Sequence, residues 1–464
     1  MSAPKRSTFG FISSVSNASM RHYELVAVLA LATVLRLLLL VFWTPELSGD
    51  ALDYDRLARS LVDGRGYTNS RGEPTSWRPP LYPAFVAAGY ILSGGSVRGV
   101  RLFQALLDVG TVALTYQLGR RLFGPSVGRI AGLLVAVNVG TIAATSRLLS
   151  ESVFTVLLMA AVVLSDGWQR AINDNRKQAA IALGIVCGAV VGAASLCRGV
   201  LLLYPLCLVA MAAICVHIGE SASVRTRSVS ERRQIVLRGG VALLLGFALM
   251  LMPWTVRNYR VHGAFIPVST QLGVALYSAY NPPDGWRFGL DAQDENTAVA
   301  ERLPEVEASA MLRRAAVESI LSSPRRTLEL EILKAVYFWV PIDWEILPFY
   351  GAFNLTYAFV GLWALGYIGL RAERRNALPT WPAWLPIIYA FGMALVIQGS
   401  PRYRLPVEPL LAVFAAAALV ALYRTAGRRT FAAVVTGTAS ALLCIYAFAG
   451  PAKHIVKGWI SGAS

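Results

Sequence analysis

Long apolar runs separated by short basic loops are the dominant pattern along the chain. Each run of about 18 residues or more is long enough to cross a hydrocarbon core of about 30 Å as a helix. The pattern predicts an all-α polytopic membrane protein with about eleven membrane-spanning helices. The predicted spans are residues 24–43, 97–118, 130–146, 152–166, 178–196, 199–217, 239–253, 349–369, 381–398, 407–423 and 431–449.

Composition and charge support this interpretation and exclude another. Of the 464 residues, 55% are hydrophobic and 15% are charged, whereas about a quarter of the residues in a soluble protein are charged. The formal net charge of +16 would suit a nucleic-acid partner, but the Lys and Arg residues cluster in the short loops that follow every second span. This distribution is typical of the cytoplasmic side of a membrane protein, so the basic residues indicate topology and no nucleic-acid partner is expected.

The loops and spans together divide the chain into four predicted parts. Residues 84–92 are too short to span and are predicted to lie at the membrane interface. The five cysteines are odd in number and show no disulfide framework or metal-ligand spacing. The predicted parts are a cytoplasmic amino terminus (1–23), a transmembrane catalytic module (24–256) with an outer loop (44–96), an outer subdomain of short helices (257–345) and carboxyl-terminal transmembrane helices (346–464).

The first outer loop contains the candidate acid–base chemistry. If a helix begins at Asp50, Tyr54 lies on the same side of it, with Asp53 near the edge of that side. Burial at the hydrocarbon boundary favours the neutral form of a carboxyl group, which predicts a raised pKa for Asp50. Asp50 is therefore a candidate general base for a hydroxyl group. The alternative is a helix cap with ordinary surface charge.

Other unusual residues fall on the same predicted outer face. Carboxylates come from the first two outer loops, and guanidinium groups come mostly from later ones. Because a guanidinium can donate two parallel hydrogen bonds to a phosphate, the set predicts a site that activates a hydroxyl and holds a lipid phosphate. The residues on this face are Asp50, Asp53, Arg78, Glu151, Arg198, Arg257, Asn258, His262, Arg402, Tyr403 and Arg404.

Structural roles remain open for several of these residues. Glu151 could cap the span that it precedes, and Arg78 could extend toward the interface beside Pro79 and Pro80. The pair Arg257 and Asn258 could anchor the chain outside the membrane. Arg402 and Arg404 oppose the positive-inside trend, which favours a functional role for them.

Six separated motifs, in order over residues 25–425, resemble bacterial family 39 glycosyltransferases. That family belongs to the glycosyltransferase C superfamily, together with protein O-mannosyltransferases and the lipid A aminoarabinose transferase. The motifs are Gly49-Asp50-x-x-x-Tyr54, Gly64-x-Gly66-Tyr67, Arg78-Pro-Pro-Leu-Tyr-Pro83, Leu148-x-Ser150-Glu151, Pro253-Trp-Thr-Val-Arg257-Asn258-Tyr259 and Pro401-Arg402-Tyr403-Arg404-Leu-Pro406.

The resemblance implies a glycosyltransferase C fold and a polyprenyl-phosphate-linked sugar as donor. It implies transfer to a periplasmic acceptor by an enzyme of the bacterial inner membrane, surrounded by membrane lipids. Many relatives work without a metal, although Asp50 and Glu151 leave open a divalent cation held by oxygen ligands. The catalytic candidates are Asp50 and Glu151, and the substrate-binding candidates are Asp53, Tyr54, Arg78, Arg257, Asn258, Arg402, Tyr403 and Arg404.

The hypothesis is an inverting, single-displacement transfer in which Asp50 takes or orients the acceptor proton. A transporter or lipid flippase is an alternative, but it would need ionisable groups in the middle of spans. Apart from Arg36 and Asp108 the spans contain almost none, and these two are predicted to serve helix packing or to reach toward a loop. A polysaccharide ligase also uses polyprenyl carriers, but it lacks the early Asp-x-x-x-Tyr motif.

Overall fold

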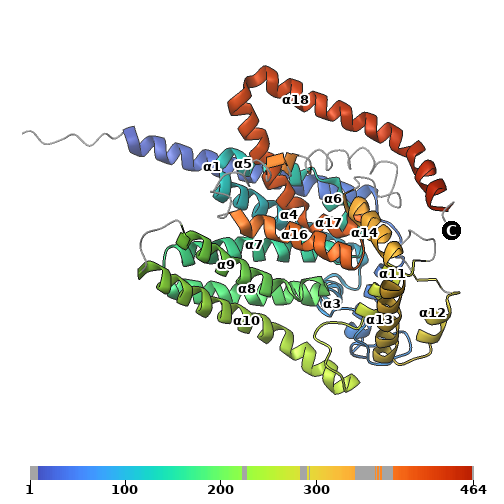
Figure 1. Cartoon of the computed structure of the whole chain (residues 1–464). Helices are drawn as coiled ribbons and strands as arrows, with labels where there is room; N and C mark the ends of the chain where they lie inside the picture. Colours follow the sequence, from blue (N-terminus) through green and yellow to red (C-terminus); the bar gives the residue numbers. More distant parts are fainter. Residues whose placement is uncertain are drawn as a thin grey trace, which may run out of the picture.

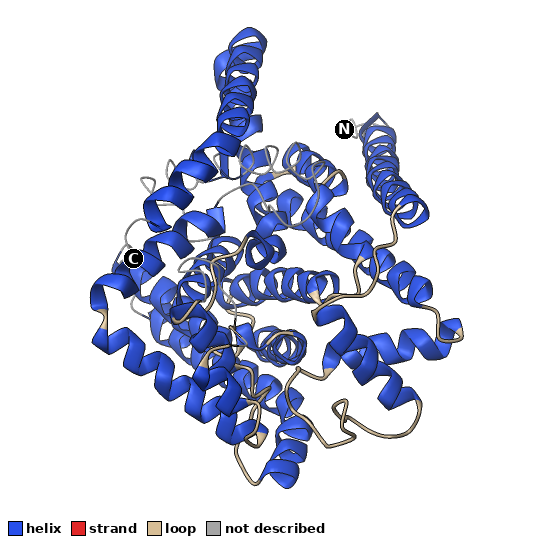
Figure 2. Cartoon of the chain, turned by 90° about the vertical axis from the view of Figure 1, so that its right-hand side faces the viewer, coloured by secondary structure: helices blue, strands red, loops and turns tan. Residues whose placement is uncertain are grey.

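The computed structural model describes residues 9–221, 227–282, 290–291, 293–339, 361, 363–364, 366–367 and 380–461. Within these ranges every regular element is a helix, apart from one isolated bridge between Thr68 and Pro74 (Figure 2). The elements are α1 (Phe9–Phe42), α2 (Asp50–Val62), α3 (Leu81–Ser93), α4 (Val97–Phe123), α5 (Pro125–Ala136), α6 (Val139–Ser146), α7 (Glu151–Asn173), α8 (Lys177–Cys197), η1 (Gly199–Leu201), α9 (Tyr204–Ser221), α10 (Arg227–His262), α11 (Leu272–Tyr280), α12 (Glu295–Ala300), α13 (Glu305–Ser322), α14 (Pro324–Trp339), α16 (Trp381–Val396), α17 (Pro401–Arg404), η3 (Leu405–Val407) and α18 (Glu408–Ser461).

The long helices run side by side as a bundle, and the short helices α2, α3 and α11 to α14 gather at one end of it, here called the loop end (Figure 1). The interfacial helix predicted at 84–92 lies within α3. The range 257–345, predicted as an outer subdomain, contains α11 to α14, although α10 continues to His262, past the expected boundary at 256. Residues 340–345 of that subdomain and the predicted span at 349–369 lie outside the described residues, apart from a few isolated positions.

Among the described residues, six helices are long and apolar enough to span a membrane, or seven if the bent pair α5 and α6 is one span. The chain is therefore a multi-pass membrane protein, but the predicted count of about eleven spans is not confirmed. One reason is length, because the predicted span at 381–398 forms a helix of only 16 residues. Another is continuity, because the predicted spans at 407–423 and 431–449 lie in the single helix α18, which bends at Gly427.

Small residues allow the closest helix packing in the bundle. Along α8, Gly184, Gly188 and Gly192 recur every fourth position and face α10. A Cβ atom added at Gly188 would lie 1.9 Å from the backbone oxygen of Leu243, so only glycine permits this approach. Spacing of this kind is the common solution for helices that pack within lipid, where close backbone contact replaces the hydrophobic driving force.

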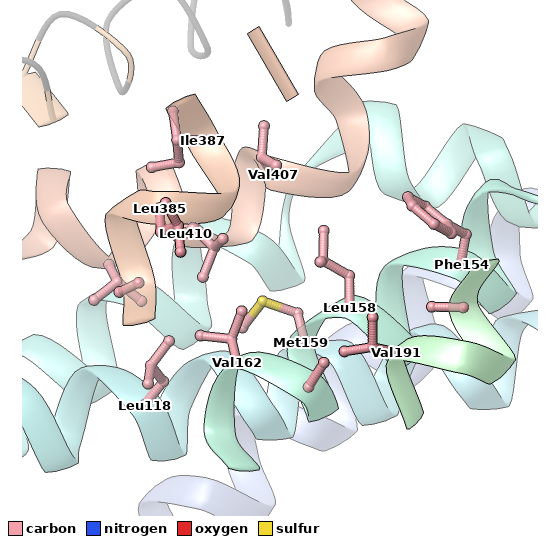
Figure 3. Packing of buried hydrophobic residues seen from close by; sticks show 14 of the residues in the cluster. Leu118, Phe154, Leu158, Met159, Val162, Val191, Leu385, Ile387, Val407 and Leu410 are labelled. Atoms are coloured by element: carbon pink, nitrogen blue, oxygen red, sulfur yellow. The ribbon is translucent and has the colours of Figure 1, made fainter. Parts of the chain in front are cut away.

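A continuous apolar core joins the amino-terminal and carboxyl-terminal halves of the bundle. Leu158, Met159 and Val162 on α7 lie against Leu385 on α16 and Leu410 on α18 (Figure 3). The core therefore brings the segment around residue 400 next to the first half of the chain. This packing is what places carboxyl-terminal arginines beside amino-terminal carboxylates.

The break between α5 and α6 is stabilised by a buried ion pair. Arg36 of α1 is fully buried and lies 2.5 Å from Asp108 of α4. Its guanidinium also donates to the carbonyl of Ala136 at 3.1 Å and to the Thr141 hydroxyl at 3.2 Å, on the two sides of a 45° bend. Each charge has its partner, so this pair serves packing, as predicted, and lends no support to the transporter alternative.

Candidate active site

The amino-terminal half of the site is built on α2. This helix begins at Asp50 and has Asp53 in its first turn, where the positive end of the helix dipole stabilises carboxylates. Tyr54 is buried one turn further on and makes an edge-to-face contact with Tyr82, with ring centroids 4.6 Å apart. The guanidinium of Arg78 lies 5.3 Å from the centre of the Tyr54 ring. The Arg78 guanidinium therefore rests on the face of the Tyr54 ring, which limits how closely it approaches α2.

Three carboxylates and three guanidinium groups form one cluster of ion pairs. Arg78 bridges Asp50 at 2.6 Å and Asp53 at 2.7 Å. Arg402, from α17 near the other end of the chain, reaches Asp50 at 2.9 Å and also pairs with Glu151. The third guanidinium, that of Arg198, lies 3.1 Å from Glu151. Three negative and three positive side chains make this cluster electrically neutral as a set.

The predicted rise in the pKa of Asp50 is wrong. Burial does push this pKa upward, but the charges of Arg402 and Arg78 and their hydrogen bonds outweigh it and lower the pKa from 3.8 to about 2. Nearby guanidinium groups favour the ionised carboxylate. The prediction considered burial at the membrane boundary without the two arginines, which are distant in sequence. In this arrangement Asp50 is an anion that orients its neighbours and is a weak base.

Glu151 has a different environment from Asp50. It opens α7, but its carboxylate points at Arg198 and Arg402, so a capping role does not explain it. Its side chain is only 2% exposed, and both arginines contact the same oxygen, Oε1. The other oxygen, Oε2, is buried and has no hydrogen-bond partner among the described residues, as is also true of Nε of Arg78. Buried polar atoms left without partners are exceptional, and they mark this as a place where a ligand with both donors and acceptors would fit.

Arg198 is a member of the site that the sequence placed on the outer face but did not select as a candidate. It occupies the break between α8 and η1, where its φ of −146° and ψ of 118° interrupt the helix. Its guanidinium lies 5.1 Å from the ring centre of Tyr403 and 5.7 Å from that of Phe154. The signal that could have found it was a single arginine between two apolar runs, which needs a buried partner.

An apolar crevice lies beside this arginine. Its walls come from α7, η1, α16, α17 and η3, and they include Phe154 and Tyr403, the two rings that Arg198 contacts. Val200, two residues after Arg198, also lines it. The crevice has a volume of about 30 Å³, and Arg198 contacts two of the rings in its walls.

The predicted residues Arg257 and Asn258 do not join the cluster. Arg257 donates to the backbone oxygens of Thr75 at 2.7 Å and Tyr67 at 3.1 Å. The fully buried Asn258 accepts a hydrogen bond from the Ser76 hydroxyl at 2.7 Å and donates to the carbonyl of Ile266. Both side chains fasten the first loop to the end of α10, which agrees with the anchoring alternative.

Arg404 also lies apart from the ion-pair cluster. It is 4% exposed, and its guanidinium contacts Glu408 at 3.2 Å and the carbonyl of Phe338 at 2.7 Å. Of the Arg-Tyr-Arg motif, therefore, only Arg402 and Tyr403 face the cluster. Helical geometry explains the difference, because residues two apart in one turn point to different sides.

A divalent cation between Asp50 and Glu151 does not fit this geometry. The guanidinium of Arg402 contacts both carboxylates and fills the position that a cation would need. Within the described ranges, no group of three or more His, Cys, Asp and Glu side chains is arranged to hold a metal ion.

A polar cleft of about 820 Å³ adjoins the cluster at the loop end. It lies between the first loop and the short helices, and its walls include Asp53, Trp77 and Glu305. Glu305 on α13 accepts hydrogen bonds from the Thr75 hydroxyl at 2.7 Å and from the Ser76 amide at 3.0 Å. The short helices are thereby tied to the loop that carries Arg78.

Comparison with known proteins agrees with this architecture. Residues 77–252, which include Arg78, Glu151 and Arg198, match the family model described as dolichyl-phosphate-mannose-protein mannosyltransferase. No curated protein sequence matches the chain.

Several solved structures match the chain. The Archaeoglobus fulgidus oligosaccharyltransferase in complex with Zn and sulfate is 16% identical with a TM-score of 0.53, over 92% of this chain and 51% of that one. The same enzyme tethered to an acceptor peptide is 15% identical with a TM-score of 0.55, over 92% and 55% of the two chains. ArnT from Cupriavidus metallidurans bound to undecaprenyl phosphate is 16% identical with a TM-score of 0.39, over 86% and 79%.

The chain spans about half the length of the archaeal enzymes that it matches. At this level of identity the similarity establishes the fold alone. The chain therefore has the fold of the glycosyltransferase C membrane enzymes, as its motifs predicted.

Proposed function

We propose that the chain is a glycosyltransferase that moves a sugar from a polyprenyl-phosphate carrier to a hydroxyl group of an acceptor. The observation that carries this proposal is the neutral cluster in which Arg402 joins Asp50 to Glu151. The family match over residues 77–252 supports the same class of donor. The sugar and the acceptor are open to experiment.

The donor phosphate would bind on the Arg402 side of the cluster. Arg402 and Arg198 share Glu151, and Arg198 lies against two rings that line the apolar crevice. The crevice has a volume of about 30 Å³, so it would have to widen to receive the first part of the polyprenyl chain. Arginine suits this role because its planar fork matches phosphate oxygens. The unused Nε–H of Arg78 offers one further donor.

Binding of a phosphate changes the charge balance of the cluster. Because the six side chains are already neutral as a set, a phosphate must replace a carboxylate as the partner of an arginine. The exposed pair offers the easiest exchange, since the side chains of Arg402 and Asp50 are 32% and 31% exposed. Once Arg402 turns to the phosphate, Asp50 loses one of the two cations that lower its pKa. Donor binding would thereby make Asp50 a stronger base.

The transfer itself would be a single displacement with inversion. The acceptor oxygen attacks the anomeric carbon while the bond between that carbon and the phosphate oxygen breaks, and the phosphate leaves with the electron pair. The acceptor proton passes to Asp50, or is oriented by it, in the usual manner of a general base. Arg402 and Arg78 stabilise the charge that develops on the leaving phosphate.

The acceptor would approach through the polar cleft beside Asp53. Asp53 lines this cleft and shares Arg78 with Asp50, so it connects the cleft to the reacting centre. The short helices on the other wall would then contact the acceptor. Their positions support a role for residues 257–345 on the acceptor side.

We further propose that the loop end faces the periplasm of a bacterium whose inner membrane holds the bundle. The support is the location of the basic loops at the opposite end, where α4 ends with Arg120 and Arg121 and α7 ends with Arg170. Arg170 donates to the backbone of Arg121 there, at 3.2 Å. Cytoplasmic loops are enriched in such residues.

A donor assay tests the proposed function. The purified full chain in detergent is given a set of undecaprenyl-phosphate sugars, and released undecaprenyl phosphate is measured by mass spectrometry. We expect turnover of at least one donor, lost when Arg402 is changed to Gln. If the full chain neither binds nor consumes any of these lipids, the proposal fails. Mass spectrometry of envelope glycans, lipids and proteins from a deletion strain would then identify the product that disappears.

A further inference from the structure

The short helix that carries Arg402 is held from outside the cluster by α14. Arg404 lies two residues after Arg402, and its guanidinium donates to the carbonyl of Phe338 at 2.7 Å. Phe338 is one of the last described residues of α14. The guanidinium therefore ties the backbone of α14 to α17.

A second contact runs in the opposite direction. Lys334 of α14 has a fully buried side chain, and its ammonium donates to the carbonyl of Leu395 at 2.8 Å. Leu395 is in the last turn of α16, so the lysine caps that helix in return. The ammonium also pairs with Glu331 at 3.0 Å and lies 3.6 Å from the centre of the Tyr280 ring. These three partners hold the buried Lys334 ammonium in one position relative to α16.

The connection from α16 to α17 also lies directly on α14. A Cβ atom added at Gly399 would fall 2.0 Å from the backbone oxygen of Lys334. No side chain fits in this space, so α14 and the segment leading to Arg402 are in backbone contact. The next residue, Ser400, opens α17 by accepting a hydrogen bond from the amide of Arg402 at 3.3 Å.

The other side of Arg404 is fixed to the bundle. Its Nε donates to Oε1 of Glu408 at 3.2 Å, and Oε2 of Glu408 accepts from the side-chain amide of Asn138 at 3.1 Å. Asn138 in turn caps α6. Arg404 is thus held between α14 and the core, and the position of α17 depends on both.

We propose that Arg404 and Lys334 are positioning residues that set Arg402 for the phosphate of the lipid donor, so that the seating of α14 controls donor affinity. This inference rests on the proposed function and deepens it. Arg402 has a long side chain that is 32% exposed. No contact within α17 fixes how far its guanidinium reaches between Asp50 and Glu151. Displacement of such a group by about 1 Å can cost up to about a hundredfold in activity. Neither positioning residue touches the cluster itself.

The test measures binding of undecaprenyl phosphate to the full chain in lipid nanodiscs. Three variants disturb the contact in different ways: Arg404→Gln, Lys334→Met and Gly399→Ala. We expect each to raise the dissociation constant about tenfold or more, as Arg402→Gln does directly. Arg404→Lys should restore part of the affinity, because an ammonium can also donate to the Phe338 carbonyl. Gly399→Ala changes no charge, and it tests the contact even if Arg404→Gln fails to fold.

A destabilised control separates positioning from general stability. Trp168→Leu removes a fully buried ring from α7 next to Gly239 of α10, away from α14. It should lower the melting temperature while keeping the dissociation constant within about threefold of the unmodified chain. If all three contact variants also stay within that range while Arg402→Gln weakens binding, the positioning inference is refuted and the proposed function stands. If the unmodified chain does not bind the lipid, the proposed function itself is refuted.

Discussion

The substitution Asp50→Asn tests the centre of the proposed mechanism because it removes one charge and keeps the size of the side chain. In the structure, Asp50 accepts from Arg78 at 2.6 Å and from Arg402 at 2.9 Å. The lowering of its pKa from 3.8 to about 2 corresponds to about 2 kcal/mol in favour of the ionised form. We therefore expect the variant to lose about 2 kcal/mol of folding free energy.

The effect on turnover should be larger than the effect on stability. A positioned general base contributes about 10²-fold to 10⁴-fold in rate, so kcat should fall by at least about a hundredfold. Binding of undecaprenyl phosphate should stay equal or become tighter, because Arg402 no longer shares its charge with Asp50. The assay compares the release of undecaprenyl phosphate from its sugar conjugate with a direct binding titration, on the same preparation.

Asp55→Asn is a matched control on the same helix. Asp55 pairs with Arg59 at 3.0 Å and accepts from the Tyr90 hydroxyl, so it also carries charge-assisted hydrogen bonds. Within the described part of the chain, Asp55 makes no hydrogen bond or ion pair with Arg78 or Arg402, so its replacement should lower stability while turnover is kept. If Asp50→Asn turned over at the rate of the unmodified chain, Asp50 would have no part in the chemistry. If both variants lost turnover equally, the loss would reflect the stability of α2 alone.

Three further predictions concern charge, anchoring and pH. Glu151→Gln should lower the folding free energy by about 3 kcal/mol, because Arg198, 12% exposed, loses its carboxylate partner and Arg402 keeps only Asp50. The same change should tighten lipid phosphate binding; thermal melts and titrations would show both effects, and weaker binding would contradict the prediction. Arg257→Gln should lower the melting temperature and leave the dissociation constant for undecaprenyl phosphate unchanged, because Arg257 bonds to the backbone of the first loop; a weakened constant would instead make it a donor contact. Folding lowers the pKa of Asp50, so its contribution to stability is present above pH 3.8 and is lost as the pH falls toward about 2. Asp50→Asn should therefore remove this part of the loss of stability, as measured by thermal melts between pH 3.8 and about 2.

The sequence predicted the membrane class and the principal members of the cluster. Asp50, Arg78, Glu151 and Arg402 come from four segments, and the structure brings them together. Motif order and the rarity of charge outside the basic loops were sufficient for this. The roles of these residues in catalysis stay predictions.

What the sequence missed depends on contacts between distant segments. The pKa of Asp50 is set by arginines 28 and 352 residues away, which no local pattern contains. Likewise, the sequence grouped Arg404 with Arg402 because they share a motif. The two side chains leave α17 in different directions and have different partners, which the motif does not show. The count of spans is not confirmed for a third reason, because hydropathy does not show where a helix bends or continues, as at the kink in α18.

In the proposed reaction, the self-neutralised cluster also bears on how the spent carrier would leave. After the proposed transfer, the lipid phosphate would be a monoester and would hold the arginines more strongly than the diester that entered. Asp50 and Glu151 remain next to the same guanidinium groups and compete for them as tethered anions, at an effective concentration that no free anion reaches. The carboxylates would thereby act as a built-in displacing agent that limits product inhibition.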